Sequence, residues 1–158
     1  LIVEDSSPQL SNNGFELLSR VFDEVPVPFE NRDVAKAFLE KTFGSQSQMA
    51  RFLLSNLGPQ SDGKQGWRFQ KEALKNLLND SFQDPLWNEW ENFQAPIHMI
   101  LGEDSGFVSD ERLQKCLSLG SKYGRSFEKV PGAGHWVHAD QAEIFCDIVQ
   151  RKIETWSI

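Results

Sequence analysis

Apolar residues occur along this chain in two different patterns. The first is continuous: Leu1 to Asp5 open on three consecutive apolar residues, and residues 95–102 form a longer apolar run. Runs of this length without regular polar alternation predict strands buried on both faces, as in a parallel sheet covered by helices. Both runs are much shorter than the ~20 apolar residues of a membrane-spanning helix.

The second pattern has helical spacing and occupies the chain from about residue 10 to residue 93. The positions that predict helices are Phe15, Leu18 and Phe22; Val34, Ala37, Phe38 and Lys41; Met49, Phe52, Leu53 and Leu57; and Leu74, Leu77 and Leu78. Gly58 and Pro59 are expected to end the third of these helices. Residues 67–69 alternate like a short strand. This region is predicted to be a mainly helical insertion with one short extended piece.

Strand and helix alternate after residue 94. The predicted elements are a strand over 95–102, a helix over 109–119, a strand over 126–130 and a helix over 140–156. Asp140 and Glu143 have the spacing of a capping box at the start of the last helix. This order favours an α/β fold with parallel strands and right-handed crossovers.

The chain begins inside a predicted strand. Leu1 opens it without an initiator Met, a basic segment or a long apolar segment, so this is neither a plain translation start nor a signal peptide. A stable parallel sheet needs more than one or two strands, so we expect an N-terminal portion to be missing. We assign residues 1–8 and 94–158 to the sheet and its helices, and residues 9–93 to a helical cap.

Composition narrows the possible partners. The 158 residues carry 16 Lys and Arg against 23 Asp and Glu, a net charge of −7. Nucleic-acid binding needs a basic face, so nucleic acid is not an expected partner, and no membrane span is expected. Cys116 and Cys146 lie on predicted apolar helix faces without metal-ligand spacing, which predicts buried thiols in a cytoplasmic or other reducing compartment.

Three loops follow the predicted strands at their carboxyl ends, where open parallel sheets bind ligands. They carry Asp5, Asp104 and His135 respectively. Gly132 and Gly134 permit a tight path that projects the His135 ring over the sheet edge. An imidazole with an ordinary pKa of about 6.5 suits a general base once a buried carboxylate orients Nδ1–H. We interpret His135 as a catalytic base; the alternative is a loop histidine bonded to backbone.

Motifs at both ends of the chain resemble those of one enzyme family. Gly102-x-x-Ser105-x-x-Val108 and residues 131–138 (Pro-Gly-Ala-Gly-His-Trp-Val-His) resemble the last third of the α/β-hydrolase fold, in which the base histidine follows the eighth strand. Residues 3–8 (Val-Glu-Asp-Ser-Ser-Pro) resemble the end of the sixth strand in a small-carboxylesterase branch, which has an Asp-x-(Ala or Ser)-Pro turn. Residues 67–69 before a leucine-containing helix resemble the cap of that branch. The resemblance implies the C-terminal part of such an enzyme.

The resemblance leaves two candidates for the acid of a catalytic triad. Most α/β-hydrolases carry it after the seventh strand as Gly-x-x-Asp, and this chain has Ser105 there, with Asp104 one residue earlier. In the esterase branch a serine at that place accompanies an aspartate at the end of the sixth strand, which matches Asp5. We favour Asp5, keep Asp104 as the alternative, and assign Ser105 as an auxiliary hydroxyl near His135.

The nucleophile is missing from this sequence. It contains no Gly-x-Ser-x-Gly, and in this family the nucleophile and the oxyanion N–H groups precede the sixth strand. The leading hypothesis is the C-terminal part of a serine-type carboxylic-ester hydrolase, inactive alone and needing no metal or cofactor, with a small ester as substrate. The alternatives are a dehalogenase or epoxide-type α/β-hydrolase and a noncatalytic ligand-binding or interaction module. An unpaired sheet edge also predicts self-association.

Aromatic residues supply the candidates for substrate binding. We assign Trp136, Phe107 and Trp67 to this role, with loop packing as the alternative for Trp136. Other aromatic residues are expected in the core of the helical lid: Phe38, Phe43, Phe52, Phe69, Trp87 and Trp90. His98 is interpreted as a core histidine, and His138 as a residue that supports the start of the last helix.

Overall fold

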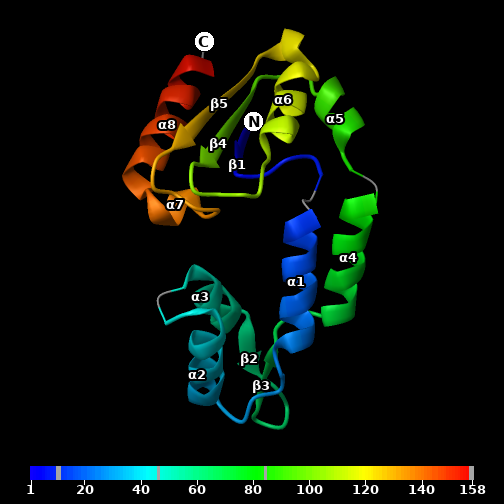
Figure 1. Cartoon of the computed structure of the whole chain (residues 1–158), viewed down its shortest axis with the longest axis vertical. Helices are drawn as coiled ribbons and strands as arrows, with labels where there is room; N and C mark the ends of the chain where they lie inside the picture. The colour runs from blue at the N-terminus through cyan, green and yellow to red at the C-terminus, as the bar shows by residue number, and fades with distance from the viewer. Residues whose placement is uncertain (10–11, 46, 84, 157–158) are drawn as a thin grey trace. The chain divides into compact units, whose positions relative to one another are not determined.

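The computed structural model describes residues 1–9, 12–45, 47–83 and 85–156 of the chain (Figure 1). They divide into two units, one of residues 1–15 with 80–158 and the other of residues 16–79. The first unit contains a parallel sheet, and the second is mainly helical. The finer division into residues 1–8, 9–93 and 94–158 stays a prediction.

Three parallel strands form the sheet in the described part of the first unit. They are β1 (Ile2–Glu4), β4 (Ile97–Gly102) and β5 (Arg125–Val130), in the order β1-β4-β5. Glu4 pairs with Ile100, and Gly102 pairs with Val130, so the carboxyl ends lie together at one edge. Every residue of β4 is buried, as its continuous apolar run predicts for a central strand. The expected parallel sheet is confirmed.

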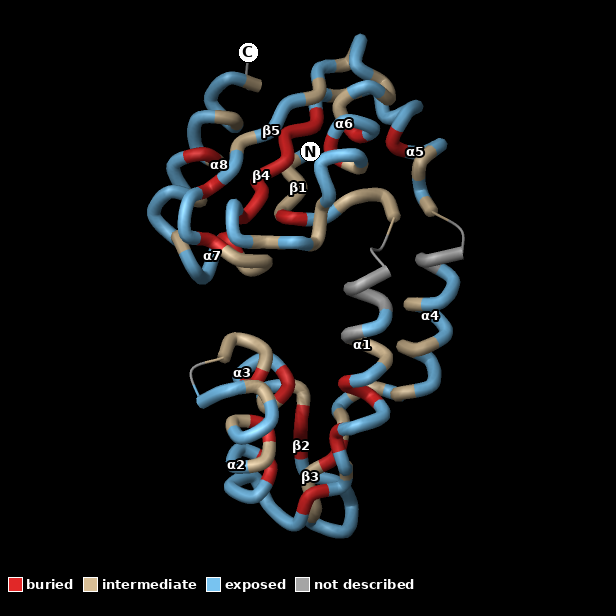
Figure 2. Tube along the Cα trace, viewed as in Figure 1, coloured by how far each residue is buried: buried red, intermediate tan, exposed pale blue. Residues whose placement is uncertain are grey.

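Helices cover both faces of this sheet (Figure 1). The elements are α5 (Trp87–Asn92), α6 (Asp110–Ser118), the 3₁₀ turn η1 (Ser121–Tyr123), α7 (Val137–Asp140) and α8 (Ala142–Trp156). Ile97, Met99 and Leu101 pack with α5 and α6, whereas Ile100 packs with α7 and α8. Because side chains alternate along a strand, β4 contributes to a separate apolar cluster on each face. Figure 2 shows β4 in red, the colour of buried residues.

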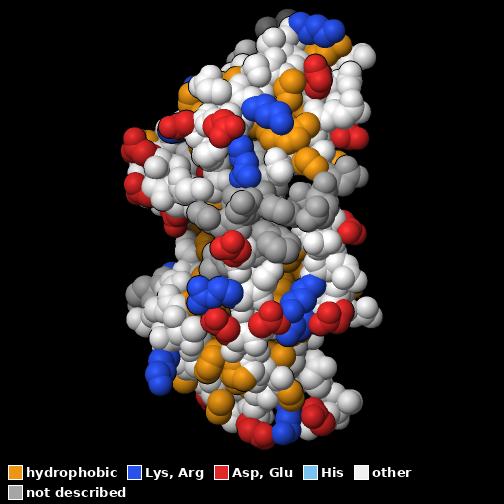
Figure 3. All heavy atoms as spheres, turned by 45° about the vertical axis from the view of Figure 1, so that its right-hand side comes forward, with side chains coloured by type: hydrophobic (Ala, Val, Ile, Leu, Met, Phe, Trp, Pro, Cys, Tyr) orange, Lys and Arg blue, Asp and Glu red, His pale blue; other side chains and the backbone are white. Residues whose placement is uncertain are grey.

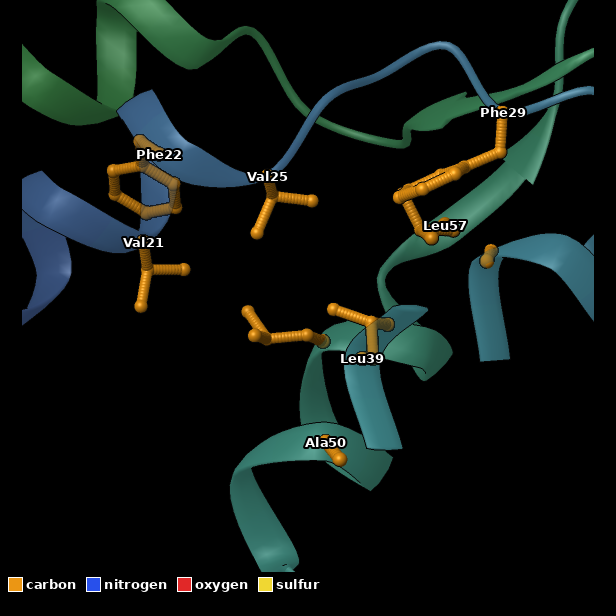
Figure 4. Close-up of a cluster of buried hydrophobic side chains, with 9 residues drawn as sticks. Val21, Phe22, Val25, Phe29, Leu39, Ala50 and Leu57 are labelled. Atoms are coloured by element: carbon orange, nitrogen blue, oxygen red, sulfur yellow. The ribbon is translucent and has the colours of Figure 1, made fainter. Parts of the chain in front are cut away.

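The second unit surrounds a two-stranded antiparallel ribbon. Its elements are α1 (Asn12–Glu24, from residue 16), α2 (Arg32–Phe43), α3 (Gln48–Ser55), β2 (Leu57–Pro59), β3 (Gln65–Trp67) and α4 (Lys71–Gln83, as far as residue 79). One cluster of buried side chains joins these elements (Figure 4): Val21, Phe22, Val25, Phe29, Ala35, Leu39, Ala50, Leu53 and Leu57. Each large member contributes about 1.5–3 kcal/mol by burial, so this unit has its own hydrophobic core.

Two details of the helical insertion differ from the sequence prediction. On α2 the buried side chains are Ala35 and Leu39, whereas Val34 is exposed, so the inward face is rotated from the predicted one. The segment Leu57–Pro59, predicted as the end of a helix, is a strand, and its partner is Gln65–Trp67 rather than residues 67–69. The bounds of both strands are set by their pairing with each other. The local spacing of apolar residues does not indicate this pairing.

The last predicted helix, 140–156, begins two residues later in the structure, as α8. Asp140 is the last residue of the short helix α7, and Gln141, with φ −137°, separates α7 from α8. The carboxylate of Asp140 accepts a hydrogen bond from Gly134 N–H at 2.9 Å. Because Asp140 ends α7 and does not directly precede α8, the predicted capping box is wrong.

Four further residues test the predicted core. Trp87 and Trp90, expected in the lid, pack instead in the cluster of β4 and α6, where Trp90 Nε1 donates to Cys116 O at 2.9 Å. Cys116 is buried as predicted, and burial raises the pKa of its thiol to about 11. Cys146 is exposed on α8, so its predicted burial is wrong.

Charged groups are interspersed on the surface. Figure 3 shows acidic and basic side chains mixed over the face it presents. Exposed pairs such as Arg20–Glu24 and Lys75–Asp23 contribute little stability because water screens them. Within the described ranges, no helix has both the length and the apolar character that crossing a membrane requires.

His98 is a fully buried histidine in the central strand β4. Its Nδ1 lies 2.8 Å from Ser126 Oγ, and its Nε2 lies 3.3 Å from Glu128 Oε1. Burial lowers the pKa of His98, and the positive charges of Lys152 and Arg151 lower it further, while Glu128 opposes this shift. The fold therefore favours the neutral imidazole.

The burial of His98 makes the free energy of unfolding depend on pH. The unfolded chain takes up this proton below about pH 6.5, whereas the folded protein does so only at lower pH. Stability should therefore fall as the pH decreases through 6.5 toward the folded-state pKa, since the unfolded state binds more protons there. His98→Gln keeps a polar partner for Ser126 and cannot titrate, so it should flatten this dependence. Urea unfolding of both proteins across this pH range measures the difference, and parallel curves would contradict the prediction.

Candidate active site

Asp5 lies directly after β1 at the carboxyl edge of the sheet. Its N–H donates to Ile100 O at 2.8 Å, and its positive φ of 36° then turns the chain out of the strand. This backbone region is uncommon outside glycine, and aspartate tolerates it better than most residues. The side chain is only 1% exposed. A carboxylate buried to this extent needs hydrogen bonds that replace its hydration.

The carboxylate of Asp5 has three such partners among the described residues. Gly102 N–H donates to Oδ1 at 3.2 Å, and Ser105 Oγ–H donates to Oδ2 at 2.5 Å. His135 Nδ1 lies 2.8 Å from the same Oδ2. Both carboxylate oxygens are used, and these charge-assisted bonds offset the cost of burial. The structure thus brings together Asp5, Ser105 and His135, which the sequence motifs place in one site.

The loop that carries His135 lies on the end of β4. Asp104 N–H donates to Ala133 O at 3.0 Å. A Cβ atom on Gly102 would clash with the carbonyl oxygens of Ala133 and Gly134, so the loop fits only because residue 102 has no side chain. This close approach sets the height of the His135 ring above the sheet.

The hydrogen bond to Asp5 fixes which nitrogen of His135 is free to accept a proton. An ionised carboxylate only accepts, so Nδ1 carries the proton in the arrangement assigned from this bond. Nε2 of the neutral ring is then unprotonated, and the side chain is 35% exposed. This tautomer is the one that a histidine needs to take a proton from a nucleophile.

Asp104, the alternative acid, lies outside this arrangement. It is exposed, and its contact with the histidine loop is made by its backbone N–H. Ser105 Oγ, by contrast, donates to the Asp5 carboxylate and accepts a hydrogen bond from Phe107 N–H at 3.2 Å. The geometry therefore pairs His135 with Asp5.

Two of the aromatic residues assigned to substrate binding lie against His135. Phe107 is stacked on the imidazole, with ring centroids 3.7 Å apart and planes 10° apart. Trp136 is tilted by 47° at 5.9 Å. Trp67 belongs to the second unit, where it stacks on Phe69 at 5.2 Å. The role of these three residues in binding substrate stays a prediction. The stacking of Phe107 on the His135 ring was not indicated by the spacing of residues in the sequence.

Glu4 is a residue of this region that sequence reasoning missed. Its carboxylate contacts His138, both at the backbone N–H and at Nδ1. The available signal was a charged residue inside an otherwise apolar strand. The sequence interpretation of His138 as a support for the last helix did not include this partner.

Metal ligation is not indicated by these side chains. Across the part of the chain that the structure describes, no group of three or more His, Cys, Asp or Glu residues could hold a metal ion.

Similar proteins were found by sequence and by structure. No family model matches the chain. The sn-1-specific diacylglycerol lipase ABHD11 of Danio rerio is 28% identical over 153 residues, which cover 89% of this chain and 45% of that protein. Esterase Rv0045c of Mycobacterium tuberculosis is 24% identical over 162 residues, which cover 98% of this chain and 52% of that protein.

Structural similarity decides the fold. The crystal structure of E-2-(acetamidomethylene)succinate hydrolase matches with a TM-score of 0.75 and 21% identity, over 97% of this chain and 56% of that one. This chain has the fold of the C-terminal portion of an α/β-hydrolase. The chain spans about half the length of the curated relatives it matches. The fold expected from the motifs at both chain ends is confirmed.

Gly102→Ala tests whether the histidine loop depends on the missing side chain. The added methyl group must displace the carbonyl groups of residues 133 and 134, which should cost about 1–3 kcal/mol of stability and weaken the His135–Asp5 bond. Gly106→Ala is a matched control, because a Cβ there meets no atom within 4 Å. Urea denaturation measures the stability, and NMR of the imidazole protons follows the hydrogen bond. Equal stability of the two variants would refute this explanation of Gly102.

Proposed function

We propose that this chain supplies the acid and the base of a serine-type carboxylic-ester hydrolase. The observation that carries the proposal is the 2.8 Å contact between Nδ1 of the partly exposed His135 and the buried carboxylate of Asp5. Acyl transfer by a serine needs a base held in this tautomer and a carboxylate that stabilises the imidazolium. The similarity to hydrolases and esterases supports the same class.

In the proposed reaction, a serine oxygen attacks the ester carbonyl carbon while Nε2 of His135 takes the hydroxyl proton. The imidazolium keeps its Nδ1–H bond to Asp5 and then gives the Nε2 proton to the leaving alcohol. Water hydrolyses the acyl-enzyme by the same two transfers, which releases the acid and restores the serine. All the groups that take part in these reaction steps are protein side chains, substrate or water.

Ser105 is not the proposed nucleophile. Its Oγ donates to Asp5 Oδ2 at 2.5 Å and so lies on the Nδ1 side of His135, whereas a nucleophile must face Nε2. We assign Ser105 to holding the Asp5 carboxylate. The nucleophile and the oxyanion donors are supplied by a part of the protein that precedes β1.

The proposed substrate is a small ester. Two relatives are named as a diacylglycerol lipase and an esterase, which supports carboxylic-ester chemistry at this site. Phe107 and Trp136 lie beside the proposed base and are assigned to the substrate pocket, together with Trp67. Residues 9–93 are assigned to a cap, whose core is the cluster described for the second unit.

The outer strand β1 is the proposed contact with the preceding part of the protein. An apolar hollow beside it is lined by Leu1, Val3, Leu86, Trp90 and Phe93. An exposed strand edge with apolar surroundings favours pairing with another strand. We propose that the preceding part of the same protein covers this edge, and that the 158-residue chain by itself self-associates.

The state of the cysteines supports a reducing location. Cys116 and Cys146 are both free thiols. Free thiols persist in compartments kept reduced by glutathione and thioredoxin. We therefore assign the protein to the cytoplasm or another reducing compartment.

Substitution of the acid and the base tests the proposed mechanism in the intact protein. His135→Ala should abolish turnover of a short-chain aryl ester, because it removes the proposed base. Asp5→Asn keeps a residue that tolerates the left-handed backbone and removes the charge, and should lower kcat by about three to four orders of magnitude. Circular dichroism checks that both variants fold. Unchanged turnover in His135→Ala would remove this residue from the mechanism.

The 158-residue chain alone should lack esterase activity. It contains the proposed acid and base but no Gly-x-Ser-x-Gly element for the nucleophile. Hydrolysis of 4-nitrophenyl acetate by the purified chain measures this, with its His135→Ala variant as the background. Turnover above that background would show that the nucleophile lies within the chain.

A further inference from the structure

Beside Asp5 and His135, the same two segments form a second acid–histidine pair. Glu4 Oε1 accepts a hydrogen bond from His138 N–H at 2.8 Å. Nδ1 of the His138 ring lies 2.8 Å from Oε1 and 2.9 Å from Oε2 of the same carboxylate. Glu4 is the last residue of β1, and His138 is the second residue of α7. One side chain therefore binds both the backbone and the ring of a single residue.

The His138 ring is also held by α8. It packs edge-on against Phe145, with centroids 6.1 Å apart and planes 68° apart. The side chain is 53% exposed, so the ion pair itself contributes little stability. The Glu4–His138 pair instead fixes a position, because it joins the end of β1 to the first turn of α7.

Helix α7 in turn holds the loop of His135. The carboxylate of Asp140 accepts a hydrogen bond from Gly134 N–H at 2.9 Å, directly before His135. Directly after it, Trp136 O accepts the N–H groups of Ala139 and Asp140, each at 2.9 Å. The backbone on both sides of His135 is therefore attached to α7.

We propose that Glu4 is a positioning residue for His135, acting through His138 and α7. This inference rests on the proposed function of His135 as a base. Glu4 and Asp5 are consecutive, so one strand end fixes the histidine segment at two points, residues 135 and 138. A displacement of α7 would change the distance between His135 Nδ1 and Asp5 Oδ2, and proton transfer is sensitive to such displacements.

The test compares three substitutions in the intact protein that carries this chain. Glu4→Ala removes the contact to His138. Glu4→Gln keeps an amide oxygen that can accept from His138 N–H, and so should restore the position. Glu103→Ala is the matched control, since it removes an exposed carboxylate just after β4. Two readouts are followed: exchange of His135 Nδ1–H with water by NMR, and kcat and KM for a short-chain aryl ester.

Glu4→Ala should raise the exchange rate of His135 Nδ1–H about tenfold and lower kcat about tenfold. KM should stay within about twofold of the value for the unsubstituted protein. Glu4→Gln and Glu103→Ala should stay near the unsubstituted protein. Unchanged exchange in Glu4→Ala would overturn the proposal, even if the melting temperature falls. A protein without esterase activity would refute the proposed function, and the exchange rates would still decide the role of Glu4.

Discussion

The burial of one carboxylate, that of Asp5, constrains the rest of the candidate site. An ion removed from water loses several kcal/mol of hydration, and only close hydrogen bonds compensate for this. The donors come from the end of β4, from the loop that follows it and from the loop after β5. These segments must therefore reach Asp5 together, and the position of His135 follows from that requirement.

Parallel pairing makes this convergence possible. The register of β1 with β4, and of β4 with β5, places the carboxyl ends of the three strands at one edge. Asp5, Ser105 and His135 each follow a different strand, yet they meet without any long loop. The absence of a side chain at Gly102 then lets the last loop lie close enough for a direct bond.

The sequence alone predicted the elements whose signal is local or tied to a motif. The strand over 95–102 is an unbroken apolar run, and the glycines around His135 indicate a tight loop at a strand end. The structure places Asp5 rather than Asp104 beside His135, which agrees with the preference drawn from the Asp-Ser-Ser-Pro turn. The sequence signal for each of these features lies in residues that are close together in the chain.

What the sequence did not predict depends on contacts between distant residues. Glu4 and His138 are 134 positions apart in the chain. The strand Leu57–Pro59 forms by pairing with Gln65–Trp67. Asp140 has the spacing of a helix cap, but its carboxylate accepts a hydrogen bond from the N–H of Gly134. The stacking of Phe107 on His135 joins two different loops. Local periodicity carries no information on such choices, since it does not specify which tertiary partner competes for a side chain.

The 130-residue separation between Asp5 and His135 has a consequence for how the protein folds. Contacts of such long range close a large loop and form slowly compared with local helices. The entropy of closing a loop grows only logarithmically, by about 0.6 kcal/mol for each doubling of its length. Residues 16–79 form a core of their own within that loop, so this segment can acquire structure before the ends of the chain meet. Insertions and deletions in it should therefore have little effect on the contact between Asp5 and His135.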